Sequence, residues 1–302
     1  MTNNLTPFKS GFVAVMGRPN VGKSTLINAL LGQKVAAVSP RPQTTRRRQL
    51  GILTTENAQV IFIDTPGVHL PKHKLGEGMN TEARQALEHC DLVLFLVDAG
   101  DTPTEEDALL AGWLVELGKP HKVLMVLNKL DVLTADVLIE RLVAYQALLP
   151  EVETMAISAT RGDERDALLA RMVARLPEGE PFYPGEQVTD LFEREISADL
   201  VREACLLYLR DEVPHGIMVR IDEYQERGEQ GAYIAATLFV ERESHKGIVI
   251  GQNGAMLKKI GEAARHEIEA MSGRKVFLEL RVKVRNNWRD YNKLGRHIFK
   301  SS

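Results

Sequence analysis

Cysteine is scarce in this chain of 302 residues, which contains only Cys90 and Cys205. Neither belongs to a Cys-x-x-Cys motif or a His/Cys cluster, which argues against a disulfide framework or a zinc site, and we interpret both as small buried apolar side chains. Long apolar runs are also missing, since none approaches the ~20 residues that span a bilayer. The N-terminus lacks the basic start and apolar core of a signal peptide. We therefore expect an intracellular protein.

The length of the chain and its breaks predict two domains. The composition is 44% hydrophobic and 26% charged, and 302 residues suffice for roughly two cores. Three prolines and two glycines between residues 176 and 185 cannot continue a helix. We place a first domain at residues 9–178, a linker at 179–188 and a second domain with a C-terminal tail at 189–302.

Strand-like and helix-like patterns alternate in the first domain. We expect strands near 11–16, 50–54, 59–63, 92–97, 122–127 and 154–157, and helices near 23–31, 80–88, 105–117, 135–148 and 164–176. This alternation predicts an α/β fold with a mostly parallel sheet, helices on both faces and an antiparallel edge strand from the 50–63 hairpin. The second domain is expected to be α+β, with a helix near 190–211, strands near 216–224 and 232–240, helices near 245–250 and 255–271, and a strand near 275–284.

The net charge of −3 conceals two segments of opposite sign in the second domain. Residues 187–241 hold five Lys and Arg against twelve Asp and Glu, whereas residues 242–302 hold fourteen against six. A basic C-terminal end favours contact with nucleic acid or an anionic lipid surface, and a merely solubilising face is the alternative.

A phosphate-binding motif follows the first predicted strand. The pattern G-x-x-x-x-G-K-S is matched by Gly17, Arg18, Pro19, Asn20, Val21, Gly22, Lys23 and Ser24, and Thr25 continues into the first predicted helix. The glycines let the backbone turn and aim N–H groups inward, Lys23 brings positive charge to the β- and γ-phosphates, and Ser24 can reach Mg²⁺. The flanking strand and helix argue against a chance match.

The strand near 59–63 delivers a second part of the same site. It ends in Asp64, Thr65, Pro66 and Gly67. The Asp64 carboxylate can hold Mg²⁺ through water, and the Gly67 N–H can meet a γ-phosphate.

The strand near 122–127 leads into residues that can recognise guanine. It ends in Asn128, Lys129, Leu130 and Asp131. Asp131 can accept two hydrogen bonds from guanine, whereas adenine presents no such pair of donors. Lys129 can lie across the base, Asn128 can tie this loop to the phosphate loop, and the Ser158–Ala159 pair can offer a backbone N–H to the guanine carbonyl. Because the carboxyl ends of parallel strands meet at one edge of a sheet, these elements predict one guanine nucleotide site.

A Gly-x-x-Gly turn joins two predicted helices in the second domain. Such a turn lets a sugar–phosphate backbone approach the main chain, and the apolar residues Ile248, Val249 and Ile250 beside it can receive splayed bases. The turn and the order helix–strand–strand–helix–helix–strand resemble a type II KH domain. The two middle residues of the turn are uncharged, so phosphate attraction must come from Lys246, Lys258, Lys259, Arg265, Arg281, Lys283 or Arg285. We predict RNA contacts from Lys246, Gly247, Ile248, Ile250, Gly251, Gln252, Asn253, Gly254, Lys258 and Lys259.

A P-loop GTPase domain followed by a KH domain resembles the Era family, within the TrmE-Era-EngA-like GTPase superfamily, from Ser10 to about residue 299. The motifs that carry the resemblance are residues 17–26, 43–46, 64–67 and 240–242. The resemblance implies a switch that binds GTP or GDP with Mg²⁺, hydrolyses GTP, and binds the 3′ end of 16S rRNA through the KH domain. It also implies association with the 30S precursor in ribosome assembly and peripheral contact with the inner membrane, and we expect a monomer.

Hydrolysis is expected to depend on positioning and on charge, without a covalent intermediate. We assign catalytic roles to Lys23, Thr45 and Gly67. The first switch segment should run from about residue 38 to 49, with Thr45 as the preferred Mg²⁺ ligand and Thr44 as the second choice. The basic run Arg46, Arg47 and Arg48 either contacts RNA or protein or forms a solvated loop.

Position 68 holds a valine where Ras-like GTPases place a glutamine that orients water. A valine neither donates nor accepts a hydrogen bond, so we expect slow intrinsic turnover. Related GTPases with a Pro-Asn-x-Gly-Lys-Ser loop use the asparagine to bind K⁺ between the phosphates. Asn20 therefore either binds K⁺ or only fixes the loop.

Two other functions need comparison with an RNA-binding switch. One is a GTPase coupled to RNA modification or to membrane-associated signalling, but residues 187–302 contain no catalytic cysteine arrangement, metal cluster or cofactor motif. The other is a membrane anchor built from the helix near 190–211. Its apolar stripe, formed by Leu191, Ile196, Leu200, Cys205 and Leu206, is more typical of packing into a core.

Overall fold

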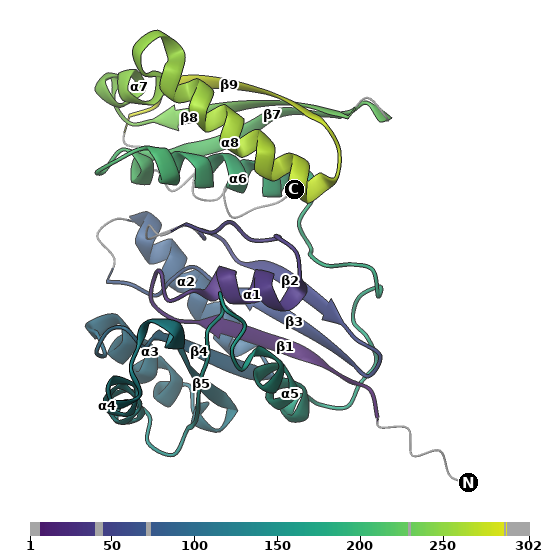
Figure 1. Cartoon of the computed structure of the whole chain (residues 1–302), viewed down its shortest axis with the longest axis vertical. Coiled ribbons are helices and arrows are strands. Elements are labelled where there is room, and N and C mark those ends of the chain that lie inside the picture. Colours follow the sequence, from purple (N-terminus) through teal and green to yellow (C-terminus); the bar gives the residue numbers. More distant parts are fainter. Residues whose placement is uncertain (1–6, 40–44, 71–73, 229–230, 287, 289–302) are drawn as a thin grey trace. The chain divides into compact units, whose positions relative to one another are not determined.

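The computed structural model describes residues 7–39, 45–70, 74–228, 231–286 and 288. The chain divides into two compact units, the first formed mainly by residues up to Asp190 and the second mainly by residues from Leu191 onward. Figure 1 shows both units.

The first unit is built on a six-stranded sheet in the order β2-β3-β1-β4-β5-β6. The strands are β1 (Lys9–Met16), β2 (Gln49–Thr54), β3 (Ala58–Asp64), β4 (Leu92–Asp98), β5 (Val123–Asn128) and β6 (Glu153–Ala156). Strand β2 is an edge strand antiparallel to β3, and the other neighbours run parallel. The predicted α/β sheet with one antiparallel edge strand is confirmed.

Helices cover both faces of this sheet, with α1 and α5 in front of it and α2 behind it (Figure 1). They are α1 (Lys23–Leu31), α2 (Lys74–Glu88), α3 (Glu105–Glu116), α4 (Ala135–Gln146) and α5 (Arg165–Arg175), with short 3₁₀ turns at Pro120–Lys122 and Leu130–Val132. Every residue of β3, β4 and β5 is buried, as expected for parallel strands between two helical layers.

Helix α2 corrects one predicted boundary. We expected it near residues 80–88, but it begins at Lys74. Its first turns contain Gly76 and Gly78, whose low helix propensity conceals the helix in the sequence. Full burial of the Met79 side chain supplies stabilisation that propensity lacks.

The strand order places a binding crevice at the carboxyl end of β1. Strand β1 lies between β3 and β4, so the connections that follow β1 and β3 lead to opposite sides of it. In open α/β sheets, ligands bind where the strand order reverses in this way. The phosphate loop begins at this point.

The second unit is α+β, and its element order confirms the prediction. It contains α6 (Glu193–Tyr208), a 3₁₀ turn at Pro214–Gly216, β7 (Met218–Glu226), β8 (Ala232–Val240), α7 (Glu243–Ile250), a 3₁₀ turn at Gln252–Gly254, α8 (Ala255–Ser272) and β9 (Val276–Val284). Strand β8 is central, antiparallel to β7 and parallel to β9. Helices α6 and α8 pack against each other and against the sheet (Figure 1).

The apolar stripe of α6 lies inside this second unit. Ile196, Leu200 and Cys205 belong to the core of this unit, and Leu191 packs against it; Leu206 is also buried. The core alternative for this helix is therefore confirmed. Of the helices in the described ranges, none has the length and apolar character needed to cross a membrane.

The segment expected to be a linker runs along the first unit in an ordered path. The Gly179 N–H donates to the Phe8 carbonyl (3.0 Å), and the Phe182 and Tyr183 N–H groups donate to Gln59 Oε1 (2.7 and 3.0 Å). Prolines and glycines end the helix at this point, but they do not prevent the chain from pairing in an extended form.

The end of this segment covers β2. The Ile52 N–H donates to the Val188 carbonyl (2.9 Å), the Leu50 N–H donates to Asp190 Oδ1 (2.8 Å), and Gly51 forms an antiparallel bridge with Thr189. We call residues 179–190 the strap. The strap covers the outer edge of β2, which would otherwise present unpaired backbone groups.

We expect a first-unit fragment to need this strap for full stability. At about 1 kcal/mol for each of the five hydrogen bonds described above, residues 1–178 should be less stable than residues 1–190 by about 5 kcal/mol. Urea unfolding of both fragments followed by circular dichroism would measure the difference. Equal midpoints and slopes would show that the strap contributes nothing to the stability of the unit.

Candidate functional site

The phosphate loop has its predicted form because two of its glycines meet other groups at close range. A Cβ at Gly17 would lie 2.2 Å from the Leu96 carbonyl oxygen, and a Cβ at Gly22 would lie 2.3 Å from Asn128 Nδ2. Gly22 also has φ near +101°, which favours glycine. Both positions therefore require glycine for steric reasons.

Lys23 is buried at the start of α1, and its ammonium group is held by the loop itself. Its Nζ donates to the carbonyls of Gly17 (3.1 Å) and Arg18 (2.9 Å). Burial lowers the pKa of Lys23 to about 8, and the nearby Asp64 carboxylate opposes this shift. The cation lies where the motif predicts contact with the β- and γ-phosphates.

Three oxygen-bearing side chains converge beside Lys23. Ser24 Oγ donates to Asp64 Oδ2 (2.8 Å), Thr45 Oγ1 donates to the same oxygen (3.2 Å), and the two hydroxyls are 3.1 Å apart. Asp64 is 1% exposed, and its Oδ1 has no hydrogen-bond partner among the described residues. Burial raises the pKa of Asp64.

These contacts fit a hard divalent cation. Hydroxyl and carboxylate oxygens are the ligands that Mg²⁺ prefers, and a buried carboxylate oxygen without a partner leaves one ligand position open. The structure thus brings Ser24, Thr45 and Asp64 together, as the sequence predicted. The second choice, Thr44, lies outside the described residues.

The base-recognition loop is fastened to the phosphate loop by Asn128. Its Nδ2 donates to the Val21 carbonyl (2.8 Å), while its Oδ1 accepts from the Ala159 N–H (3.0 Å). Ser158 Oγ donates to Asp131 Oδ1 (2.5 Å), which orients the carboxylate expected to meet guanine. The tie between the two loops is as predicted, but the Ala159 N–H must share or exchange its present partner to reach a guanine carbonyl.

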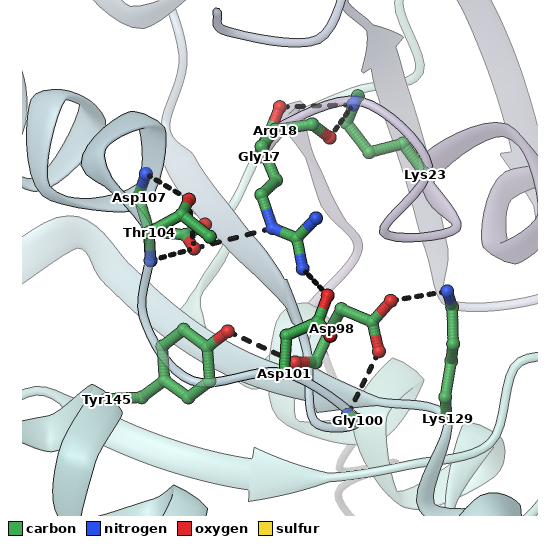
Figure 2. A network of polar contacts seen from close by, with 10 residues as sticks. All are labelled: Gly17, Arg18, Lys23, Asp98, Gly100, Asp101, Thr104, Asp107, Lys129 and Tyr145. Atoms are coloured by element: carbon green, nitrogen blue, oxygen red, sulfur yellow. Dashed lines mark hydrogen bonds and ion pairs between the residues drawn. The ribbon is translucent and has the colours of Figure 1, made fainter. Parts of the chain in front are cut away.

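The Lys129 side chain is held by an acidic residue at the end of β4. Its Nζ pairs with Asp98 (Figure 2). Lys129 has a left-handed backbone with φ near +70°, which marks the sharp turn that follows β5. The sequence offered no signal for Asp98, because a lone aspartate at a strand end is common.

The segment after β3 places Gly67 against the phosphate loop. A Cβ at Gly67 would lie 2.6 Å from the Pro19 backbone nitrogen, so only glycine fits. The Val68 N–H donates to the Gly17 carbonyl (3.0 Å), and the Val68 side chain is fully buried in the core. Position 68 therefore serves packing, which agrees with its inability to orient water.

The Gly-x-x-Gly turn of the second unit is formed as expected between α7 and α8. Gly251 and Gly254 have φ near +72° and +80°, and Gln252 and Asn253 are exposed. A Cβ at Gly251 would lie 2.7 Å from Met256 Cβ, whereas a Cβ at Gly254 would meet nothing within 4 Å. The main chain at Gly254 is thus open to a ligand.

A groove of about 430 Å³ runs from this turn along α8 to the edge strand β9. It combines an apolar floor with cations and one acid, and its lining residues are Gly254, Leu257, Lys258, Gly261, Glu262, Arg265, Phe277, Leu278 and Leu280. Phe277 is 66% exposed and stacks on Tyr233 with ring centroids 5.8 Å apart. Exposed aromatic rings are the usual stacking partners of unpaired bases.

The groove changes part of the predicted RNA surface. Lys258 lines it, but Lys259 Nζ lies over the Tyr208 ring of α6 (4.4 Å), on another side of α8. Val249 is fully buried in the core and cannot receive a base, whereas Ile248 is 50% exposed. The apolar β9 residues of the groove, Phe277, Leu278 and Leu280, were missed, although the alternation in Val276–Val284 marks a strand with one open face.

Comparisons with known proteins agree with both sites. A family model described as "50S ribosome-binding GTPase" matches residues 12–129, and one described as "KH domain" matches residues 212–289. GTPase Era of Ruminiclostridium cellulolyticum is 45% identical over 94% of this chain and 94% of its own. GTPase Era of Geobacter metallireducens is 45% identical over 97% of this chain and 98% of its own.

This chain belongs to the Era family of GTPases. Two solved Era structures are similar to it throughout. One is a complex with MgGDPNP and nucleotides 1506–1542 of 16S ribosomal RNA, with a TM-score of 0.91, 40% identity and coverage of 97% of this chain and 98% of the other. The second, Aquifex aeolicus Era bound to GDP.AlF4⁻, has a TM-score of 0.90, 40% identity and coverage of 97% and 99%.

Membership of the Era family confirms the GTPase assignment, with GTP or GDP and Mg²⁺ as its ligands. In such a site Lys23 would supply positive charge to the phosphates, and Ser24, Thr45 and Asp64 would hold Mg²⁺, which would supply further positive charge for phosphoryl transfer.

The geometry of Asp131 predicts a change of base preference. In the Asp131→Asn variant the carboxylate acceptor becomes an amide that can donate, so preference should shift from guanine toward xanthine nucleotides by about tenfold or more. Competition of GDP, XDP and ADP against a fluorescent nucleotide would measure it. Asp136→Asn, an exposed substitution on α4, provides a matched control. A native protein that bound ADP as tightly as GDP would contradict the role of Asp131.

Proposed function

We propose that this protein is a nucleotide-gated RNA-binding switch that acts on the small ribosomal subunit precursor. The observation that carries the proposal is the presence, in one chain, of a complete guanine nucleotide site and a KH groove beside an open Gly-x-x-Gly turn. The similar Era structure in complex with nucleotides 1506–1542 of 16S ribosomal RNA supports the 3′ end of that RNA as the ligand.

The groove suggests how the RNA is held. The open main chain at Gly254 can receive the sugar–phosphate backbone, with Lys258 and Arg265 near enough to neutralise phosphates. Leu257, Leu278 and Leu280 supply an apolar floor for bases, and Phe277 offers a ring at the rim. Ile248 and Ile250 extend the apolar surface beside the turn.

A substitution at Gly254 separates RNA binding from folding. Gly254→Asp places a negative charge where the phosphate backbone must pass. Its Cβ meets nothing within 4 Å, and the left-handed backbone at φ near +80° costs an aspartate about 1–2 kcal/mol, so the second unit should still fold with somewhat lower stability. We expect RNA affinity to fall by at least about a hundredfold, whereas Lys258→Ala should weaken binding modestly and reduce the slope of affinity against salt by about one.

RNA titrations of both variants at two salt concentrations would measure these effects, with an oligonucleotide of the 3′ end of 16S rRNA as the probe. Lys275→Ala, which changes an exposed lysine outside the groove, is the control. A folded Gly254→Asp protein that binds with native affinity would show that the turn has no role in RNA binding.

Asn20 is proposed to bind K⁺ between the phosphates. It has a left-handed backbone with φ near +66°, and it lies exposed in the middle of the phosphate loop. GTP turnover should be several-fold faster in K⁺ than in Na⁺ at equal ionic strength, because a bound cation supplies charge that Val68 cannot. Asn20→Ala should lose this difference. Equal turnover of the native protein in both salts would leave Asn20 with a structural role.

Two expectations from the family resemblance complete the proposal. The protein is expected to contact the inner membrane peripherally, which flotation with vesicles of anionic lipid would test. It is also expected to be a monomer, which sedimentation velocity would test. Crosslinking in cells followed by sequencing of the bound RNA should give a peak at the 3′ end of 16S rRNA, and an enrichment elsewhere would overturn the proposed ligand.

A further inference from the structure

The segment from Asp98, the last residue of β4, to Asp107, in the first turn of α3, contacts both the phosphate loop and the base-recognition loop. Figure 2 shows the two contact points: Arg18 of the phosphate loop meets Asp101 and Asp107, and Lys129 of the base-recognition loop meets Asp98. None of these three aspartates belongs to a nucleotide-binding motif.

The phosphate-loop end of the segment is largely buried. The Arg18 guanidinium pairs with Asp101, and its Nε lies 3.4 Å from Asp107 Oδ2. The Arg18 side chain is 15% exposed and that of Asp107 is fully buried, whereas Asp101 is 58% exposed. The contact with Asp107 is therefore shielded from water and the contact with Asp101 is not.

Arg18 is tied at both ends. Its side chain reaches α3, while its backbone carbonyl accepts one of the hydrogen bonds that fix Lys23 Nζ (2.9 Å). Holding the guanidinium thus limits movement of the carbonyl that orients the phosphate-binding cation. The second carbonyl in this contact, that of Gly17, immediately precedes Arg18.

Asp107 is itself fixed by the first turn of α3. Its Oδ2 accepts hydrogen bonds from the Thr104 N–H (3.0 Å) and Thr104 Oγ1 (2.9 Å), which form a capping box with the Asp107 N–H. Its Oδ1 is buried without a hydrogen-bond partner among the described residues. Burial raises the pKa of Asp107, and the nearby Arg18 opposes the shift.

The base-loop end has contacts through both side chain and backbone. Asp98 pairs with Lys129, and its Oδ1 accepts from the Gly100 N–H (3.0 Å). The Ala99 N–H donates to the Asn128 carbonyl (2.9 Å), and the Asp98 carbonyl accepts from Tyr145 Oη (3.1 Å). The turn is closed by the Asp101 N–H, which donates to the Asp98 carbonyl (3.2 Å).

We propose that residues 98–107 act as one positioning segment that couples phosphate binding to base binding in this GTPase. Asp107 and Asp101 position Arg18, and Asp98 positions Lys129, within a stretch whose two ends are joined by a closed turn and a helix cap. None of these aspartates is placed in contact with the nucleotide. Loosening either end therefore changes nucleotide affinity indirectly, through the loop that the residue holds.

Two single variants of the full-length protein and their double variant test this coupling. Asp107→Asn keeps the shape of the side chain and an oxygen for Thr104, but it removes the charge that pairs with Arg18. We expect it to raise the Kd for GDP about tenfold, within the range typical of coupled sites. Asp98→Asn should raise the same Kd several-fold by freeing Lys129. The double variant should bind little worse than Asp107→Asn alone, because the segment has already lost its fixed geometry.

Fluorescent GDP would serve as the probe for Kd and for the dissociation rate. Glu105→Gln, an exposed acid in the same turn of α3, is the matched control and should leave both unchanged. In steady-state GTP hydrolysis, Asp107→Asn should raise KM with kcat within about twofold of native, since a positioning residue affects ground state and transition state alike. A loss of folded protein would instead lower the apparent kcat and leave KM unchanged.

Two results would overturn the inference. One is an Asp107→Asn protein with native thermal unfolding and a Kd for GDP within twofold of native. The second is a double variant whose fold-change equals the product of the single fold-changes, because independent loops give multiplicative effects. If Asp107→Asn does not fold, Arg18→Lys tests the same contact, since it keeps the charge and loses the forked guanidinium; native Kd and KM in that variant would also overturn the inference.

Discussion

The arrangement of the nucleotide site depends on burial of the Lys23 ammonium at the carboxyl end of β1. A cation removed from water needs oxygen partners or a countercharge, and Lys23 obtains them from two loop carbonyls and from nearby Asp64. Asp64 is equally buried and is held by Ser24 and Thr45. A bound nucleotide would bring negative charge to Lys23, and Mg²⁺ would bring positive charge to Asp64. Burial of these two charged groups explains why the phosphate loop is fixed by several hydrogen bonds.

Buried strands of the sheet hold the loops around these groups in place. Strands β3, β4 and β5 are buried along their whole length, so the loops that follow them start from fixed points. Val68 extends this core into the segment after β3. The nucleotide site is thus well ordered, but the Val68 side chain can neither donate nor accept a hydrogen bond to orient a water molecule.

Local signals predicted most of the fold and the nucleotide site, and long-range contacts account for the rest. Periodicity and motif spacing were sufficient for the strands, for residues 17–24 and for Asp64, because those patterns are confined to short stretches of chain. The early start of α2 was hidden by two glycines, and its stabilisation comes from the buried Met79 side chain. The direction of Lys259 and the burial of Val249 depend on how α7 and α8 pack, which no single-helix pattern contains. Asp98 and Asp107 were missed for the same reason, since their partners lie tens of residues away.

The strap bears on the order in which the chain can fold during synthesis. Strand β2 is made early, yet the residues that cover its outer edge are among the last of the first unit to leave the ribosome, well over a hundred positions later. Until then the growing chain carries an open β-edge, the kind of surface that recruits another nascent strand. Completion of the GTPase unit therefore waits for residue 190, so a translational pause shortly before that point would prolong the exposure and a pause shortly after the strap has emerged would shelter it.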